Sequence, residues 1–205
     1  MDLDPKELRG SSEAAPVSVL QNRYFVKTFR PEIGFLAGTF LNEAYTDTTC
    51  YGVRASLFMN EFLGFEFQSI QTNIEASDDR KALDNLAYRR IDNEEIVTPV
   101  PEINPIKGVT DANVIFAPFY GKLNIVDNFI VYSDVYVSAG ASQVKTEFQG
   151  DKTAFSAGIG QRFYWKKSVS LRIDFRDRIY SELRSNEKIV KNAYSFDIGM
   201  SYFFL

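Results

Sequence analysis

The chain contains no histidine and only one cysteine, Cys50, in 205 residues. Because there is no second cysteine, no disulfide can form within the chain and no cysteine-based metal site can be built. Catalytic triads and most general-base mechanisms depend on a histidine, which this chain cannot supply. These absences predict a protein that is not an enzyme and that holds no metal or other cofactor.

Long apolar runs and clusters of positive charge are also missing. No stretch reaches the roughly 18 continuous apolar residues that a membrane helix needs. The net charge is −4, and lysine and arginine are not clustered, so nucleic acid is not expected as a partner. The opening stretch, MDLDPKELRGSSEAAP, is polar and acidic and is not a signal peptide. If the protein is exported, we expect this sequence to be the mature form with a starting Met added.

Aromatic residues, by contrast, are abundant and occur in period-2 alternation. They make up 15% of the chain, with 18 Phe and 11 Tyr. In the closing stretch NAYSFDIGMSYFFL, every second residue from Tyr194 to Phe204 is large and apolar, whereas the residues between, from Ser195 to Ser201, are small or polar. This pattern predicts a β-strand with one apolar and one polar face.

Similar alternation predicts an all-β fold of eight strands. They cover residues 31–40, 50–58, 63–71, 113–126, 129–147, 153–165, 168–180 and 192–204.

The joins between these strands are alternately tight and long, which is typical of an up-and-down antiparallel barrel. The first and last strands should pair to close it. The longest join, 74–112, is expected to contain a helix within 77–92, because Ser77 followed by aspartates is an N-cap signal. Residues 1–28 show no periodicity and are expected to form a flexible lead-in, which leaves 29–205 for the barrel.

Most charged residues in the middle of the strands share the polar parity, with five acids and five bases, whereas Asp177 near a strand end has the opposite parity. An interior network of ion pairs is therefore expected, made by Glu32, Arg54, Glu66, Lys122, Asp134, Arg162, Arg172, Asp174, Arg176 and Asp197.

Two observations favour charges inside and apolar residues outside. An eight-stranded barrel is barely wide enough for its own side chains, so large aromatics from every strand would overpack it. Near one rim, moreover, Phe163, Trp165, Tyr202 and Phe204 gather on the apolar face, as in the aromatic girdle of a transmembrane barrel. The fold class expected is thus an eight-stranded up-and-down transmembrane β-barrel, with the 74–112 join as a long extracellular loop and membrane lipid around it.

An ordered series of segments carries a family resemblance. It comprises VLQNRYFVKTFRPEIGFLAGTFLNEAY, FAPFYGKLNIV, DVYVSAGASQVKT, SAGIGQRFYW and LRIDFRDRIY. From about residue 19 to the end, the chain resembles the small outer-membrane β-barrel domain proteins of the myxobacterial type. The resemblance implies an outer-membrane location, and we expect the end of the closing strand, at Phe204 and Leu205, to be recognised by the outer-membrane insertion machinery.

Three functions remain open at this point. The chain could be a structural or interaction protein with a closed, charge-paired lumen, a narrow channel for small polar solutes, or a soluble lipocalin-like carrier; the first is favoured. A strip of small residues on the outward parity suggests association into a ring of barrels that encloses lipid, because small residues permit close packing in membranes. The strip consists of Ala117, Gly121, Ser133, Val135, Val137, Ala139, Ala141 and Ala157.

Overall fold

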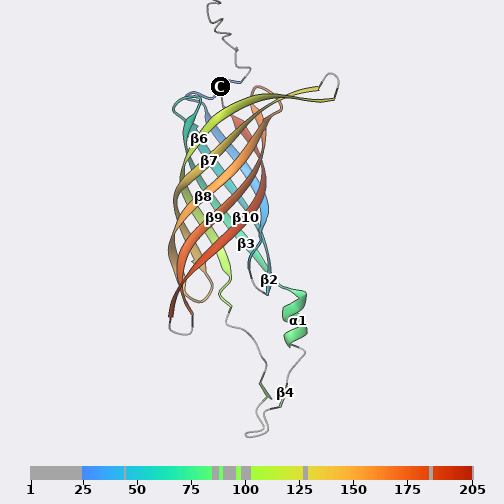
Figure 1. Ribbon diagram of the computed structural model, residues 1–205, viewed down its shortest axis with the longest axis vertical. Helices are drawn as coiled ribbons and strands as arrows, with labels where there is room; N and C mark the ends of the chain where they lie inside the picture. The colour runs from blue at the N-terminus through green and yellow to red at the C-terminus, as the bar shows by residue number, and fades with distance from the viewer. Residues whose placement is uncertain are drawn as a thin grey trace, which may run out of the picture.

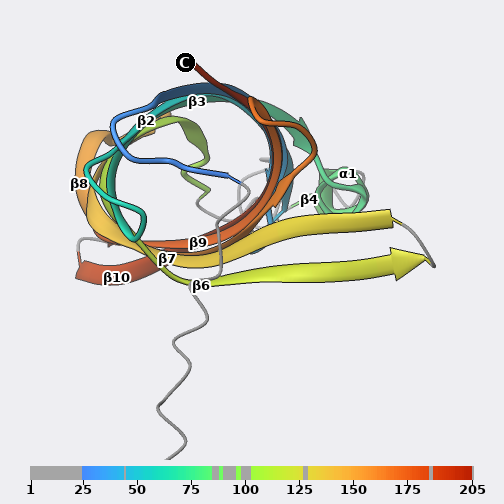
Figure 2. The ribbon, with the colours of Figure 1, turned by 90° about the horizontal axis from the view of Figure 1, so that it is seen from above.

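The computed structural model describes residues 25–43, 45–84, 88–89, 96–97, 103–126, 129–184 and 187–204. It shows one closed antiparallel barrel of eight strands, drawn upright in Figure 1 and from above in Figure 2. Its strands are β1 (Pro31–Phe40), β2 (Thr46–Phe58), β3 (Leu63–Ala76), β6 (Ile106–Val126), β7 (Phe129–Thr146), β8 (Gly150–Tyr164), β9 (Val169–Arg184) and β10 (Glu187–Phe203). The eight-stranded fold expected from the sequence is confirmed.

Neighbouring barrel strands follow one another in the chain, and the seam joins the first strand to the last. β1 pairs with β10 from Glu32 opposite Phe203 to Phe40 opposite Ser195, as expected. Gly38 lies opposite Asp197 in this seam, where an added Cβ would stand 2.1 Å from the carbonyl oxygen of Phe196. Only a residue without a side chain therefore allows the two strands to approach this closely.

The excursion between β3 and β6 is shorter than the 74–112 segment expected, because β3 continues to Ala76 and β6 begins at Ile106. The excursion contains the helix α1 (Asp78–Asp84), and the Ser77 hydroxyl accepts a hydrogen bond from the Arg80 amide at 3.3 Å. The helix expected within 77–92 is therefore confirmed. Two short strands, β4 (Tyr88–Arg89) and β5 (Ile96–Val97), form a separate two-stranded sheet that takes no part in the barrel.

The other joins at the same end are shorter than expected. The sequence predicted loose connections around 148–152 and 181–191, but β7 and β8 are separated only by 147–149, and β9 and β10 only by 185–186. The reason is that polar residues there continue the strand ladder instead of leaving it. We call this end, which carries the α1 excursion, the long-loop end, and the opposite end, where the described chain both enters and leaves, the short-turn end (Figure 1).

The two faces of the barrel wall differ in chemistry. Along β10 the burial alternates residue by residue, with Ser195 and Asp197 buried and Phe196 and Ile198 exposed. The same alternation leaves large apolar side chains exposed on all eight barrel strands. Among the described helices, none is long and apolar enough to cross a membrane.

The lumen is filled in three layers. One apolar cluster lies toward the long-loop end and includes Phe40, Ile70 and Val144. A second lies toward the short-turn end and includes Phe58 and Phe203. Most of the buried charged side chains lie between these two clusters.

Candidate functional site: the charged lumen

The centre of the lumen is organised around Glu66 on β3. Its carboxylate accepts hydrogen bonds from Arg172, at 2.7 Å, and from Arg176, both on β9. Arg54 on β2 lies 3.5 Å from the same carboxylate. All four side chains are almost completely buried. Three cations from two strands therefore converge on one anion that the third strand supplies.

Arg54 connects this centre to two further acids. Its Nη1 donates to Asp174 at 2.7 Å, and its Nη2 donates to Asp197 at 2.9 Å. Asp174 also accepts a hydrogen bond from the Tyr136 hydroxyl, which in turn accepts one from Arg172 Nε at 2.9 Å. These contacts cross the barrel from β2 to β7, β9 and β10, so the network ties opposite walls together.

Two glycines make room for this layer. An added Cβ at Gly160 would lie 2.4 Å from the Tyr136 ring, and one at Gly158 would lie 2.7 Å from Cγ of Arg176. The pair Gly158 and Gly160 on β8 therefore leaves space in the lumen for the large side chains of its neighbours.

Toward the short-turn end, Asp134 on β7 joins three groups. It accepts hydrogen bonds from Lys27 Nζ at 2.5 Å and from the Tyr164 hydroxyl at 2.7 Å, and Arg162 Nη1 lies 3.7 Å away. Arg162 also donates to Glu32 on β1 at 3.1 Å. Buried charges at this end thus all have partners of opposite sign.

The short-turn mouth is occupied by residues that the sequence assigned to a flexible lead-in of 1–28. Residues 1–24 lie outside the described residues, but Phe25 and Lys27 are buried, which corrects the boundary. Phe25 stacks on Tyr164 with ring centroids 4.1 Å apart and contacts the Phe203 ring at 4.8 Å. The aromatic rings of the mouth and the buried Asp134 carboxylate favour this insertion, which period-2 analysis cannot detect in a segment without alternation.

Arg30 forms hydrogen bonds across the outside of the same mouth. Its guanidinium donates to the carbonyl oxygens of Phe204, at 3.0 Å, and Lys167, at 2.9 Å. It also donates to the Val26 carbonyl at 3.1 Å. One side chain thereby links the entering segment, the β8–β9 turn and the end of β10.

Toward the long-loop end, a further buried pair was missed by the sequence analysis. Arg178 on β9 donates to both carboxylate oxygens of Asp111 on β6, with Nε–Oδ1 at 3.0 Å and Nη2–Oδ2 at 2.7 Å. Arg178 continues the parity of Arg172 and Arg176, so alternation alone could have identified it. Asp111 could not be found in that way, because it lay in the segment assigned to a loop.

At the long-loop rim, the side chain of Glu43 is buried close to Lys191, with 3.4 Å between carboxylate and ammonium. Burial raises the pKa of the Glu43 carboxyl above its ordinary value, and the positive charge of Lys191 partly opposes that rise.

The structure brings together every residue of the expected network except Lys122. Lys122 is exposed on β6, because this part of the strand extends beyond the barrel. It has the inward parity but no lumen to enter, so its assignment to the network is wrong.

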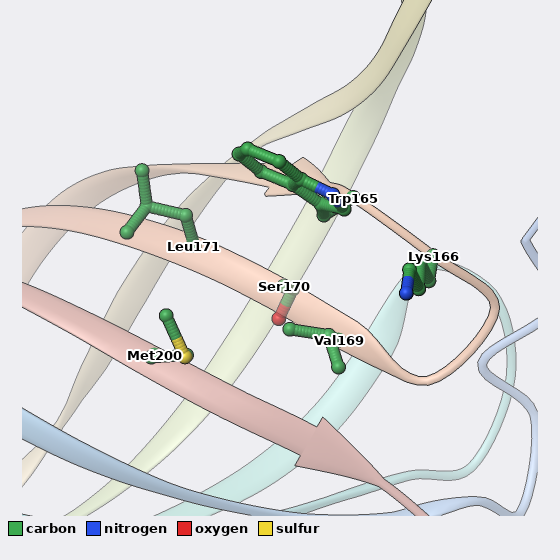
Figure 3. A pocket seen from close by; sticks show the side chains of 6 residues that line it. All are labelled: Trp165, Lys166, Val169, Ser170, Leu171 and Met200. Atoms are coloured by element: carbon green, nitrogen blue, oxygen red, sulfur yellow. The ribbon is translucent and has the colours of Figure 1, made fainter.

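The aromatic residues expected to form a girdle lie at the short-turn end. Trp165 is 72% exposed, Tyr202 and Phe204 are exposed and contact each other edge-to-face at 5.2 Å, and Phe163 is half-buried. Beside them, a groove of about 330 Å³ runs over the outer wall between β8, β9 and β10, lined by Trp165, Lys166, Val169, Ser170, Leu171 and Met200 (Figure 3). The outer surface near this rim is thus apolar with a lysine at its edge.

Two residues of the small-residue strip need correction, Ala117 and Ser133. Ala117 is only 2% exposed and packs in the apolar cluster of the short-turn end, because it keeps the inward parity of Ile115 and the parity inverts only at the bulge before Phe119. Ser133, opposite Phe163 on the outward parity, is only 5% exposed. The other members are at least partly exposed: Gly121, Val135, Val137, Ala139, Ala141 and Ala157.

The chemistry of the lumen is that of ion pairing. Its charged groups are neutralised by one another, and no nucleophile with a neighbouring histidine base can exist in a chain without histidine. Within the described residues, no group of three or more acids or cysteines is placed to hold a metal ion. Chemically, the arrangement can join the strands of the barrel to one another through ion pairs and hydrogen bonds.

We predict that Glu66→Gln strongly destabilises the barrel, because it leaves three buried guanidinium groups short of one negative charge. Breaking a buried ion pair from one side costs about 3–5 kcal/mol. Glu147→Gln is the matched control, because Glu147 forms an exposed pair with Lys107 at 3.2 Å, and such pairs contribute about 0–1 kcal/mol. Urea unfolding in lipid vesicles measures both; equal stability of the two variants would contradict the assigned role of Glu66.

No protein-family model matches the chain, and no curated protein sequence matches it. Among solved structures, the N-terminal β-barrel domain of Pseudomonas aeruginosa OprF is similar, with a TM-score of 0.52 and 12% identity over 86% of this chain and 98% of that one. Neisserial surface protein A gives a TM-score of 0.46 and 10% identity over 86% and 98%. Ail of Yersinia pestis gives 0.36 and 15% over 85% and 97%. At these identities the likeness concerns the fold alone, and the chain therefore has the fold of an outer-membrane β-barrel domain.

Proposed function

We propose that the chain is an integral outer-membrane protein with a closed, charge-paired lumen and a structural or interaction role, not an enzyme. The observation that carries the proposal is the contrast between the two faces of the wall. Arg54, Arg162, Arg172, Arg176 and Arg178 are fully buried inside, whereas the exposed outer face is rich in Phe, Leu, Ile and Val. Lipid is the solvent in which such an outer face is stable.

The contrast argues against a soluble lipocalin-like carrier. Such a carrier needs an apolar lumen for its ligand and a polar exterior, which is the reverse of this arrangement. The membrane location is further supported by the girdle residues near the short-turn rim and by the fold shared with the OprF domain. Extraction of the protein from cell envelopes by alkaline carbonate, without detergent, would contradict that location.

A narrow channel for small polar solutes is the second candidate. Within the described part of the chain, the hydroxyl groups of Ser56, Ser138, Ser156 and Ser170 are buried without a protein hydrogen-bond partner. Buried polar groups of this kind are commonly satisfied by water, which favours some hydration of the lumen. The layer of crossing arginines and the Phe25–Lys27 segment in the mouth favour a closed path instead.

We predict no steady single-channel conductance for the wild-type protein in planar lipid bilayers, because ion pairs span the lumen from wall to wall. The measurement compares wild type with Arg172→Ala and with Lys107→Ala, a control at an exposed cation. A steady wild-type conductance that changes in Arg172→Ala, but not in the control, would replace the closed-lumen proposal with the channel.

The same proposal includes the orientation of the barrel in the outer membrane and the narrower family to which it would belong. The α1 excursion, residues 77–105, would face the cell exterior as a surface for a partner, and the short-turn end would face the periplasm, as in barrels with short periplasmic turns. The terminal aromatic Phe204, exposed at the end of β10, supports recognition by the outer-membrane insertion machinery. The resemblance to proteins of the myxobacterial type belongs to this proposal as well.

We also propose that barrels associate through the remaining small residues on β7 and β8. Val137, Ala139 and Ala141 are exposed on the outer face of β7, and Ala157 lies opposite Ala139 on β8. Lipid gives no hydrophobic gain on association, so close packing of small residues is the available attraction. Head-to-tail contacts of this type can close into a ring, and an apolar inner wall would enclose lipid and not water.

We predict that Ala139→Trp combined with Ala141→Trp converts the associated form into monomers in mild detergent without unfolding the barrel. The bulky rings prevent close approach but remain compatible with lipid. Crosslinking in native membranes, followed by electrophoresis, measures the association. A wild-type protein that is already monomeric in those membranes would refute the ring.

A further inference from the structure

The turn between β6 and β7 is not a simple rim turn. β3 pairs with β6 only as far as Leu63 opposite Phe116, and β8 pairs with β7 only from Tyr164 opposite Tyr132. Beyond these points β6 and β7 pair only with each other, as far as Val126 opposite Phe129. Figures 1 and 2 show the resulting hairpin leaving the barrel sideways at the short-turn end. We call its described residues, 119–126 and 129–131, the projecting hairpin.

The departure begins at Ala117 and Pro118. The register shifts between Phe116, opposite Val137, and Phe119, opposite Val135, so that two residues of β6 face one of β7. Such a bulge bends and twists a strand, and proline, which lacks an amide hydrogen, ends pairing with a neighbour on that side. The Ala117 amide still donates to the Phe62 carbonyl at 2.7 Å, so the barrel contact ends at the bulge itself.

The two faces of the projecting hairpin differ. Phe119 is 71% and Leu123 41% exposed on the face that continues the outer wall of the barrel, and their cross-strand partners are Val135 and Val131. This face carries no charged residue among positions 119, 121, 123, 131, 133 and 135. The opposite face carries the exposed Lys122.

Tyrosines tie that opposite face to the barrel mouth. The rings of Tyr120 and Tyr132 stack with centroids 6.1 Å apart, and both pack against the apolar cluster of the short-turn end. The hairpin is therefore held at its base by one face. On its other face Val131 and Ser133 are buried, whereas Phe119 and Leu123 are left exposed. In Figure 1 the outer part of the hairpin is seen nearly edge-on, whereas Figure 2 shows its flat side, so its faces look along the barrel axis.

We propose that the projecting hairpin lies on the lipid surface at the short-turn end, with Phe119 and Leu123 in the membrane interface and Lys122 in water. A two-stranded hairpin is marginally stable in water unless one face is covered. An apolar face opposite a lysine is the composition of elements that bind in the plane of a membrane interface. The outward face of the wall is continuous with this apolar face, through the exposed Phe116 and Val137. The inference rests on the membrane location proposed above.

Fluorescence quenching of a nitrobenzoxadiazole probe tests the orientation. The probe is attached to single cysteines in a Cys50→Ala background, at Phe119→Cys or Leu123→Cys on the apolar face, Lys122→Cys on the other face, and Val114→Cys on the barrel wall. The protein is folded into vesicles of phosphatidylethanolamine and phosphatidylglycerol, and heat-dependent electrophoretic mobility confirms the folding of each variant. Brominated acyl chains quench probes in lipid, and iodide quenches probes in water.

The probes at 119 and 123 should lose emission with brominated lipid, at a depth of about 5–10 Å below the surface, and should resist iodide. The probe at 122 should be quenched by iodide alone.

If the probe at 114 is quenched by brominated lipid while the probes at 119 and 123 are quenched by iodide, the hairpin inference fails and the membrane location stands. Shielding of 119 and 123 from both quenchers would show that protein, such as a second copy, covers the face, and would also overturn the inference. If 114 itself is not quenched by lipid, the membrane location and the hairpin inference fail together.

Discussion

A charge buried in a narrow barrel must have a partner, and the structure of the lumen follows from this constraint. The interior of an eight-stranded barrel is only as wide as its own side chains, and removing an ion from water costs several kcal/mol unless an opposite charge replaces the water. Glu66 meets the requirement for three arginines at once, and Arg54 extends the pairing to Asp174 and Asp197. Because these residues come from different strands, satisfying the charges also fixes how the strands close.

The surroundings of the network serve the same constraint. Gly158 and Gly160 leave room for Arg176 and Tyr136. Apolar clusters lie on both sides of the charged layer, and the Phe25–Arg30 segment covers the short-turn mouth with Lys27 as the partner of Asp134. A lumen filled in this way is suited to stability, and the interaction role proposed above would fall to the rims, the α1 excursion and the projecting hairpin.

The sequence predicted the barrel and the main charge network because both depend on parity. Arg172 and Asp197 are predicted to point inward because the residues before and after each of them are apolar and point outward. That information lies within a single strand. The errors arose where parity changes or is absent. The bulge at Ala117 and Pro118 inverts the faces of β6, so Ala117 has the inward parity of Ile115 and not the outward parity of Phe119. Lys27 follows no alternation, and Asp111 lies in a strand extension whose ladder depends on partners far along the chain.

The central claim is that the wall is charged inside and apolar toward lipid, and nitroxide accessibility along β10 tests it most directly. Spin labels at Phe196, Ile198 and Met200, each in a Cys50→Ala background and folded into lipid vesicles, are exposed to oxygen and to a water-soluble nickel chelate. The account predicts frequent collision with oxygen, which concentrates in the acyl chains, and little collision with nickel at all three positions. Protection of the three labels from both reagents would mean that these side chains face a packed interior, and it would contradict the account.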